Sequence, residues 1–277
     1  MTIDRGAALR DLHRPGAPFV LANAWDMGSA KVLAALGAEA IGTTSNGHAF
    51  TLGRPDMGRI SRDEALAHAQ DLVAATALPV SGDLEDGYGA APETVAETVR
   101  LAAEAGLAGC SIEDTIFTEL GAYEFDLAVD RIRAASAAAR ALPGDFVLVA
   151  RADGMMNGVY DLHEALRRLR AFDAAGADCL YAPLPPDMDA LRQICQTTRK
   201  PVNALAVGRF AGVTRQAFAD LGVARISLGS GLARVAQGAL ITAARAMLET
   251  GDFSAIRQAA KGSEVQALLE QATVPDP

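Results

Sequence analysis

The sequence predicts an α/β protein that folds as a closed (β/α)8 barrel, the TIM-barrel architecture. Two observations favour this fold. Eight short apolar runs recur along the 277 residues, and stretches with helical periodicity separate them. Short connections between such elements imply parallel strands and right-handed crossovers. No Pro/Ser-rich linker or charge block divides the chain, so residues 1–277 are expected to form a single domain.

The eight apolar runs are the expected strands. In chain order they are FVLANAWD (19–26), AIGTTS (40–45), LPVSGDLE (78–85), GCSIED (109–114), FVLVARAD (146–153), CLYAPL (179–184), PVNALA (201–206) and RISLGS (225–230). Eight strand–helix units over most of the chain fit a closed barrel. A doubly wound open sheet is the alternative, and it is disfavoured because no strand is followed by a Gly-rich phosphate-binding fingerprint.

Local signals mark the ends of the expected helices. Four glycines each follow a helical stretch and precede a strand, the spacing of a left-handed C-cap: Gly37, Gly106, Gly176 and Gly222. Ser61 with Glu64, and Asp161 with Glu164, have the spacing of a capping box. Beyond the eighth unit, residues 252–272 form a further amphipathic stretch, which we expect to be a C-terminal helical extension.

Composition excludes several classes of protein. Half of the residues are hydrophobic and there is no long polar tract, which excludes disorder, and three cysteines are too few for a disulfide scaffold. The net charge of −9 argues against a nucleic-acid partner and against an anionic membrane. The N-terminus lacks the apolar core of a signal peptide, and no apolar stretch reaches the roughly 20 residues of a membrane span. We therefore expect a soluble, cytoplasmic protein.

Function in such barrels collects at the carboxyl ends of the strands. Polar or charged side chains stand at these positions in most of the predicted units. The main candidates are Thr43, Thr44 and Ser45 at the second strand, Asp83 and Glu85 at the third, Glu113 at the fourth, Arg151 at the fifth, Asn203 in the seventh and Arg234 after the eighth.

The acidic residues among them suggest a metal site. Asp83 and Glu85 are two apart in a predicted strand, so both are expected on one face, and Glu113 is expected at the matching height of the next strand. Carboxylates that converge in a partly desolvated site require protons or a cation. Oxygen ligands without His or Cys favour Mg²⁺ or Mn²⁺. The alternative is that these acids pair with arginine or cap the following helices.

Two further candidates each have two interpretations. Arg151 ends an apolar run, where a buried guanidinium needs an anion; it either neutralises the acids or grips a substrate carboxylate. Residues 46–58 are expected to form a loop above the barrel that holds Asp56, either as a functional side chain or as part of an Asx-turn.

Four motifs together resemble the isocitrate lyase / phosphoenolpyruvate mutase family. They are LGRPD in the strand-two loop, SGDLEDGYG after the third strand, SIED at the fourth and VARAD at the fifth, and the resemblance runs from about residue 18 to 250. It implies a (β/α)8 barrel, often with the last helix exchanged between the subunits of a dimer or tetramer. It also implies a Mg²⁺-bound 2-oxo acid or its enolate.

The resemblance assigns roles to individual residues. Asp83 matches the metal-binding Asp, Glu85 the second acidic position, and Glu113 a Glu that usually reaches the metal through water. Asp56 matches a catalytic loop Asp, and Arg151 a substrate-binding Arg that also supplies positive charge during the reaction. The implied substrate-binding set is Thr43, Thr44, Ser45, Arg151, Asn203 and Arg234.

The sequence also departs from the family pattern. Isocitrate and methylisocitrate lyases have a Lys-(Lys/Arg)-Cys-Gly-His loop after the fourth strand, whereas SIEDTIFTELGAYEF has no Cys, Lys or His. The phosphonate enzymes have Lys and Asn in that loop, where this chain has Glu119 and Gly121. Pro183 stands near the position of the strand-six Glu of methylisocitrate lyase. Proton delivery to the leaving carbon is left to Tyr88, Asp56 or a water on the metal.

The expected function is a Mg²⁺- or Mn²⁺-dependent lyase that cleaves a C–C bond beside a 2-oxo acid or enolate. Its substrate would be a small 2-oxo acid or a di- or tricarboxylate of the isocitrate, methylisocitrate or oxaloacetate type. One alternative is a phosphonopyruvate-type mutase or hydrolase that acts on P–C bonds, and another is a barrel that binds oxo acids with little turnover. A homodimer or homotetramer is expected.

Overall fold

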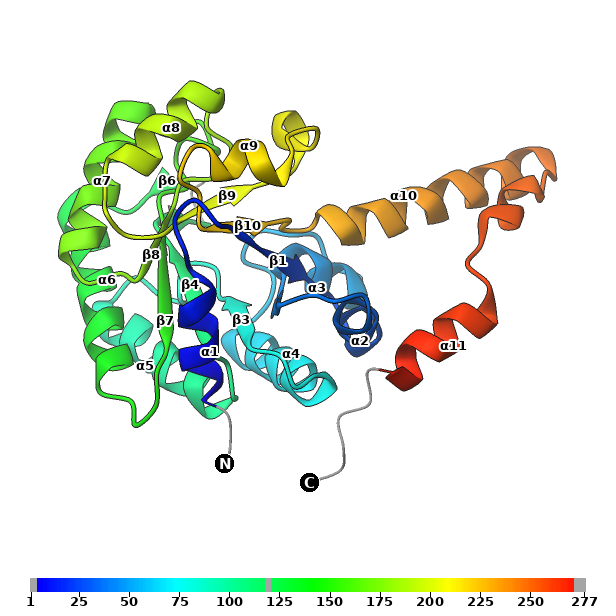
Figure 1. Ribbon diagram of the computed structural model, residues 1–277, viewed down its shortest axis with the longest axis horizontal. Coiled ribbons are helices and arrows are strands. Elements are labelled where there is room, and N and C mark those ends of the chain that lie inside the picture. The colour runs from blue at the N-terminus through cyan, green and yellow to red at the C-terminus, as the bar shows by residue number, and fades with distance from the viewer. Residues whose placement is uncertain (1–3, 118–120, 272–277) are drawn as a thin grey trace.

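Eight parallel strands close into a barrel in the order β1-β10-β9-β8-β7-β4-β3-β2, and helices surround it (Figure 1). The structure is a computed structural model that describes residues 4–117 and 121–271. Two further short strands, β5 and β6, pair with each other in antiparallel orientation. The predicted (β/α)8 fold is therefore confirmed.

The barrel strands lie where the apolar runs predicted them, and each ends at least one residue earlier than its run. They are β1 (Phe19–Asn23), β2 (Ala40–Gly42), β3 (Val80–Asp83), β4 (Gly109–Glu113), β7 (Val147–Arg151), β8 (Cys179–Tyr181), β9 (Val202–Leu205) and β10 (Arg225–Ser227). The hairpin strands are β5 (Thr115–Ile116) and β6 (Gly121–Ala122). Several polar residues that close the runs therefore belong to the loops above the barrel.

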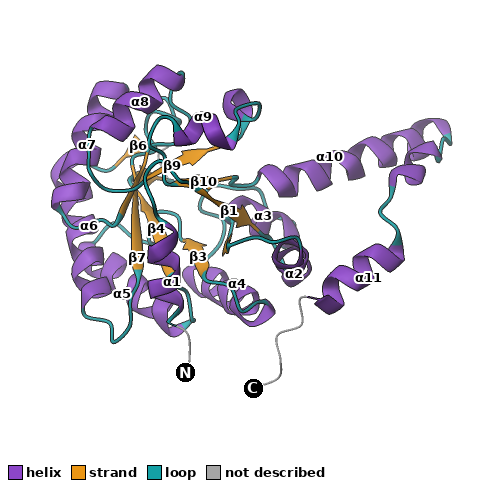
Figure 2. Cartoon of the chain, in the orientation of Figure 1, coloured by secondary structure: helices purple, strands orange, loops and turns teal. Residues whose placement is uncertain are grey.

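Most of the helices pack around the outside of the barrel, and the last two belong to a segment that leaves it (Figure 2). The helices have the following bounds. They are α1 (Arg5–Leu12), α2 (Met27–Ala35), α3 (Ser45–Thr51), α4 (Arg62–Ala75), α5 (Pro92–Glu104), α6 (Phe125–Arg140), α7 (Leu162–Ala174), α8 (Met188–Gln196), α9 (Arg215–Ala219), α10 (Gly231–Arg245) and α11 (Gly262–Gln271), with short helical turns η1 (Gly208–Phe210), η2 (Ala246–Thr250) and η3 (Ser254–Gln258).

The predicted helix ends are largely confirmed. All four C-cap glycines have left-handed backbone angles, with φ between the +86° of Gly222 and the +102° of Gly176. Ser61 and Glu64 form the reciprocal capping box at the start of α4. Asp161 accepts a hydrogen bond from the backbone N–H of Glu164 and so caps α7. Each cap satisfies backbone groups that a helix end leaves unpaired.

One prediction about local structure is wrong. Residues 46–58 do not form one continuous loop, because Thr44 accepts a hydrogen bond from the backbone N–H of Gly47 and starts helix α3. The predicted C-terminal helical extension is confirmed, and residues 252–271 contain η3 and α11 with a break between them. Residue 272 and Glu119 lie outside the described residues.

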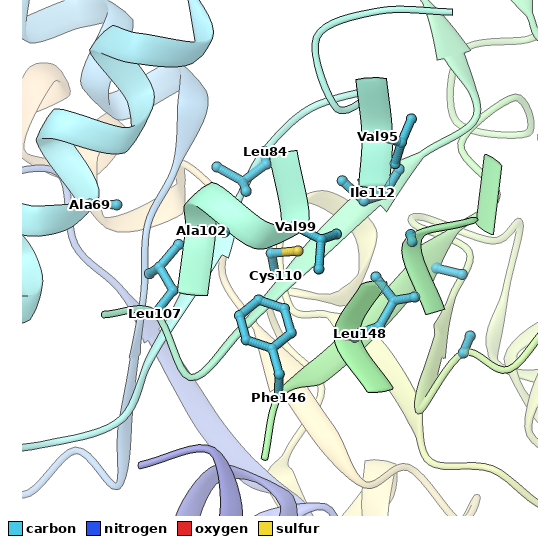
Figure 3. Close-up of a cluster of buried hydrophobic side chains, with 14 of the residues drawn as sticks. Ala69, Leu84, Val95, Val99, Ala102, Leu107, Cys110, Ile112, Phe146 and Leu148 are labelled. Atoms are coloured by element: carbon cyan, nitrogen blue, oxygen red, sulfur yellow. The ribbon is translucent and has the colours of Figure 1, made fainter. Parts of the chain in front are cut away.

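The core between strands and helices is built from small and branched apolar side chains. Figure 3 shows Val95 and Val99 of α5 next to Cys110 and Ile112 of β4, and all four are fully buried. A separate cluster, which includes Phe19, fills the interior of the barrel.

Helix α1 packs against the barrel near β7 and was not anticipated from the sequence. Arg10 pairs with Asp145 at 2.6 Å and with Asp178 at 2.8 Å, which ties the helix to the loops before β7 and β8. A Cβ at Gly6 would lie 1.7 Å from the carbonyl oxygen of Asp145, so only glycine permits this close approach. His13 follows the helix, and its Nδ1 lies 2.8 Å from the carbonyl oxygen of Leu9.

The C-terminal part of the chain leaves the barrel as an arm, defined here as residues 231–271. Helix α10 extends away from the barrel, and α11 returns to pack against α2 (Figure 1). Large apolar side chains of the arm face solvent, including Val235 at 71% and Leu248 at 78% exposure. None of the helices in the described ranges is both long and apolar enough to cross a membrane.

The stability of the fold should depend on the protonation of His13. Burial, and then the nearby Arg225, lowers the pKa of His13 from 6.5 to about 3. The folded state disfavours the charged form, so stability is full above pH 6.5 and is lost as the pH falls towards 3. The His13→Gln variant should lose this dependence, which reduces the slope of unfolding free energy against pH near pH 5 by about 1 kcal/mol per pH unit. Urea unfolding between pH 7 and 4.5 measures it; the exposed His163→Gln variant is the control, and an unchanged slope for His13→Gln would contradict the prediction.

The exposed apolar face of the arm should be covered by a second copy of the chain. We expect light scattering after gel filtration to give a dimer or tetramer, because a lone chain would leave this surface in water. Substitution of Leu240 and Leu248 by Asp should shift the mass towards that of a monomer. A wild-type monomer at micromolar concentration would refute the expectation.

Candidate active site

A cavity of about 280 Å³ opens at the carboxyl ends of the barrel strands. Its lining includes seven of the residues selected from the sequence: Thr43, Thr44, Ser45, Asp56, Asp83, Arg151 and Arg234. A larger hollow of about 990 Å³ lies on the surface, but its described lining contains no residue of the barrel strands. The smaller cavity is therefore the candidate active site, because barrel chemistry is positioned by strand ends.

Arg151, the last residue of β7, is surrounded by carboxylates. Its Nε and Nη2 donate to the two oxygens of Asp153 at 3.1 and 2.6 Å. Its Nη1 donates to Asp83 Oδ1 at 2.9 Å, and Nη2 lies 3.6 Å from Glu113 Oε2. One guanidinium thus compensates parts of three negative charges. Burial is the main reason that the pKa of Glu113 stands well above its ordinary value, although Arg151 opposes this shift.

Residues 43–45 hold Asp83 in place. The backbone N–H of Asp83 donates to Thr43 Oγ1 at 2.7 Å. The backbone N–H and the hydroxyl of Ser45 donate to Asp83 Oδ2 at 3.1 and 3.0 Å. Because Thr44 caps α3, the start of that helix and the end of β3 are joined through Asp83, which therefore has a protein partner on each oxygen.

Glu85 does not share a strand with Asp83. Strand β3 ends at Asp83, and Glu85 has a left-handed backbone with φ +48°, so the alternation that put both side chains on one face does not apply. Glu85 accepts a hydrogen bond from the backbone N–H of Gly58 at 3.2 Å and lines the larger hollow. Burial, followed by the charge of Asp83, raises the pKa of Glu85 to about 8.

Glu113 is also displaced from its expected height. The register pairs Asp83 with Ser111, so Glu113 lies two residues further along β4, where it accepts a hydrogen bond from the Thr115 hydroxyl at 3.1 Å. Within residues 4–117 and 121–271, no three His, Cys, Asp or Glu side chains are arranged to hold a metal ion. Asp83, Glu85 and Glu113 are therefore not arranged as a ready set of three ligands, and their assignment to a metal ion stays a prediction.

The remaining candidates lie at different depths. Asp56 lines the cavity and accepts a hydrogen bond from Asn46 Nδ2 at 2.9 Å. Arg234 is exposed at the start of α10 and also lines the cavity. Asn203 is fully buried in β9 and donates to the Ser227 hydroxyl at 2.9 Å, outside the cavity lining. Tyr88 lines the larger hollow and also a small pocket that it shares with Asp83 and residues 43–45.

Tyr181 and Arg225 are among the cavity-lining residues that the sequence did not predict. Tyr181 lies under Arg151, with the guanidinium carbon 5.2 Å from the ring centre. For Arg225 a signal existed, because Arg225 and Ser227 are two apart in RISLGS and so share a face of the strand. This spacing was overlooked because the run as a whole was interpreted as a buried apolar strand.

The donor chemistry of the site fits a hard divalent cation. Arg151 contacts the carboxylates of Asp83, Glu113 and Asp153. Glu85 is close enough to Asp83 for the charge of Asp83 to raise its pKa. Oxygen donors without thiolate or imidazole suit Mg²⁺ or Mn²⁺. Burial is the main cause of the raised pKa values of Glu85 and Glu113, and a divalent cation beside them would favour their charged forms. Asp83, which lines the cavity, is the residue best situated to bind such an ion.

Comparison with known proteins identifies the family. A family model described as phosphoenolpyruvate phosphomutase matches residues 9–248. The chain belongs to this family. An uncharacterized protein of Mycobacterium tuberculosis is 35% identical over 263 residues, which cover 95% of this chain and 96% of that protein. The 2,3-dimethylmalate lyase of Eubacterium barkeri is 31% identical over 203 residues, 70% of this chain and 68% of the lyase.

Solved structures agree with this assignment. A crystal structure from Burkholderia cenocepacia J2315 superposes with a TM-score of 0.91 at 45% identity, covering 98% of this chain and 96% of that chain. The motif-based prediction of an isocitrate lyase / phosphoenolpyruvate mutase superfamily member is confirmed, and the chain is an enzyme of that superfamily.

Removing Arg151 should destabilise this phosphomutase-family barrel. In Arg151→Met, the carboxylates of Asp83, Glu113 and Asp153 lose their cation, and loss of one partner of a buried pair costs about 3–5 kcal/mol. Urea unfolding at pH 7 measures the change. Arg133→Met is the control because its pair with Asp130 is exposed, and it should change stability by less than about 1 kcal/mol. Equal effects of the two substitutions would show that the Arg151 cluster does not stabilise the fold.

Proposed function

We propose that this enzyme is a Mg²⁺-dependent lyase that cleaves a C–C bond adjacent to a 2-oxo or 2-hydroxy acid. The reaction class rests on family membership and on similarity to a named C–C lyase. The site chemistry supports it independently, because a small polar cavity at strand ends combines carboxylates with a guanidinium. Phosphonopyruvate chemistry is the alternative, and the strand-four segment lacks the Lys expected of that branch.

One observation supports the proposal most strongly. Asp83 ends β3 at the cavity wall, between Arg151 and the first turn of α3. This arrangement sets a negative oxygen ligand beside a positive group and a helix N-terminus. A 2-oxo acid needs these elements in proximity, since its carboxylate is anionic and its oxo oxygen gains negative charge during cleavage.

Asp83 would hold the metal ion, and Glu85 and Glu113 would add negative charge close to it. When bound, the ion supplies a Lewis acid that stabilises negative charge on substrate oxygens. The protein contributes the rest of the electrostatic field. Both oxygens of Asp153 accept hydrogen bonds from Arg151 and fix the position of the guanidinium before substrate binds. Little reorganisation of the guanidinium is then needed during the reaction.

Asp56 is assigned the proton-transfer role. Of the two acids in the described lining of the cavity, Asp83 is engaged by Arg151, whereas Asp56 accepts a hydrogen bond from the neutral amide of Asn46. For a 2-hydroxy acid, a base removes the hydroxyl proton, the adjacent C–C bond breaks, and its electron pair remains on the leaving carbon, which then gains a proton. Asp56 accepts the hydroxyl proton in this scheme, with Asn46 holding its orientation.

A substrate panel tests the function. With MgCl₂ present, the wild type should cleave at least one of four acids. The expected products are glyoxylate from isocitrate, pyruvate from methylisocitrate or 2,3-dimethylmalate, and pyruvate or oxalate from oxaloacetate. Asp83→Ala should lower kcat/KM by at least about 100-fold, because it removes both the metal ligand and an anchor of Arg151. The Asp126→Asn variant, changed on the exposed surface of α6, should retain wild-type activity.

The other outcomes identify the competing functions. Phosphate release from phosphonopyruvate, with no cleavage of the carboxylic acids, would replace the lyase by the phosphonate reaction. Mg²⁺-dependent binding of 2-oxoglutarate or pyruvate without turnover of any compound would replace it by an oxo-acid-binding barrel. Full activity in EDTA or in Asp83→Ala would refute the metal assignment.

A further inference from the structure

The described chain buries three arginines, and one of them differs from the other two. Arg168 pairs with Asp114 at 3.0 Å and with Glu164 at 2.9 Å. Arg131 donates to the backbone carbonyls of Gly89 and Asp86 and lies over the ring of Tyr123. Arg225 is 4% exposed, yet neither its Nε nor its Nη1 has a hydrogen-bond partner in the described part of the chain.

Arg225 lies in the interior of the barrel and lines the active-site cavity. It begins β10, where it pairs in register with Phe19 of β1 and Asn203 of β9. Ser227, two residues further along the same face, also lines the cavity. Since Arg225 is nearer the amino end of β10, it lies deeper in the barrel than Ser227. It therefore contributes to the floor of the cavity, opposite the mouth at Arg234.

The surroundings of Arg225 are polar, but no acidic side chain of the described residues forms an ion pair with it. The hydroxyl of Ser81 and the amide oxygen of Asn203 are buried and also have no partner among the described residues. Both are neutral and cannot compensate a positive charge. Asp83 is close enough to affect Arg225 electrostatically, but its two oxygens already accept from Arg151 and Ser45.

An unpaired buried guanidinium is costly for the empty protein. Burial lowers the pKa of Arg225, in line with this cost. The two other buried arginines show that this fold satisfies such groups where they serve structure alone. An anion entering the cavity would remove the cost, and its energy of interaction with Arg225 would then contribute to binding.

We propose that Arg225 is a specificity residue that binds the terminal carboxylate of a dicarboxylate substrate at the floor of the cavity, with the hydroxyl of Ser81 as a second donor. The inference rests on the proposed function, in which the reacting carboxylate lies near Asp83 and Arg151. The substrate then has an anionic group at both ends, and a cavity of about 280 Å³ limits it to a compact acid. Monocarboxylic oxo acids would leave Arg225 unpaired and bind more weakly.

Matched ligand pairs test the assignment by isothermal titration with MgCl₂ present. The first pair is 2-oxoglutarate and 2-oxopentanoate, and the second is oxaloacetate and 2-oxobutanoate; within each pair a terminal carboxylate is replaced by methyl. The wild type should bind the dicarboxylate of at least one pair about 10- to 100-fold more tightly. Arg225→Met should abolish this preference and leave the affinity for the monocarboxylate within about twofold. Arg225→Lys should retain part of the preference for the dicarboxylate.

Thermal unfolding separates a binding role from a structural one. Arg225→Met removes an uncompensated buried charge, so the Tm of the ligand-free protein should stay the same or rise. Arg131→Met is the matched control, since it removes a buried guanidinium that has partners and should lower the Tm by several degrees. A large fall in Tm for Arg225→Met, together with an unchanged ligand preference, would make Arg225 a structural residue and overturn the proposal.

The remaining outcomes are also decisive. A dicarboxylate preference that survives in Arg225→Met would assign the terminal carboxylate to another group, such as Arg234, and overturn the proposal while the lyase function stands. Equal wild-type affinity within both pairs would also overturn it. Absence of wild-type binding to all four acids would refute both the proposal and the oxo-acid function, whereas an Arg225-dependent preference without turnover would support Arg225 and refute only the lyase.

Discussion

The ion-pair cluster around Arg151 is the interaction on which the rest of the site depends. Arg151 contacts carboxylates from the ends of β3 and β4 and from its own loop, and so links three neighbouring strands at the carboxyl end of the barrel. Asp83 also accepts hydrogen bonds from Ser45 and so fixes the start of α3 relative to these strands. The cluster retains an excess of negative charge, which makes this rim suited to a divalent cation and disfavours an unaccompanied anion. Structural and catalytic demands therefore fall on the same residues.

The cavity has two positively charged ends that differ in solvation. At the mouth, Arg234 is exposed and its charge is screened by water, so it contributes mainly to the approach of an anionic ligand. At the floor, Arg225 is buried, where an electrostatic interaction is stronger and discrimination between a carboxylate and a methyl group is correspondingly larger. The acids and Arg151 lie between these ends. A small dicarboxylate, with one carboxylate near Arg151 and the other at Arg225, matches this distribution better than a monoanion.

The departures from the family pattern concern the part of the site that selects the reaction. The strand-four segment continues as the β5–β6 hairpin and contributes no Cys, Lys or His. Asp56, in contrast, comes from the strand-two loop and is oriented by Asn46 of α3. Because α3 is joined to Asp83, the proposed proton acceptor and the proposed metal ligand are held by one structural unit. This coupling offers a physical basis for chemistry without the usual strand-four residues.

Sequence alone determined the architecture, because eight apolar runs, the glycine C-caps and the capping residues are local patterns that repeat along the chain. Family motifs likewise selected seven residues that line the cavity. Three features required the tertiary structure. The left-handed backbone at Glu85 ends the strand alternation, the register pairs Asp83 with Ser111 and displaces Glu113, and Arg225 turned out to be buried without a partner. Periodicity shows which face a residue occupies, but only closure of the barrel decides the register between strands and which charges meet across its interior.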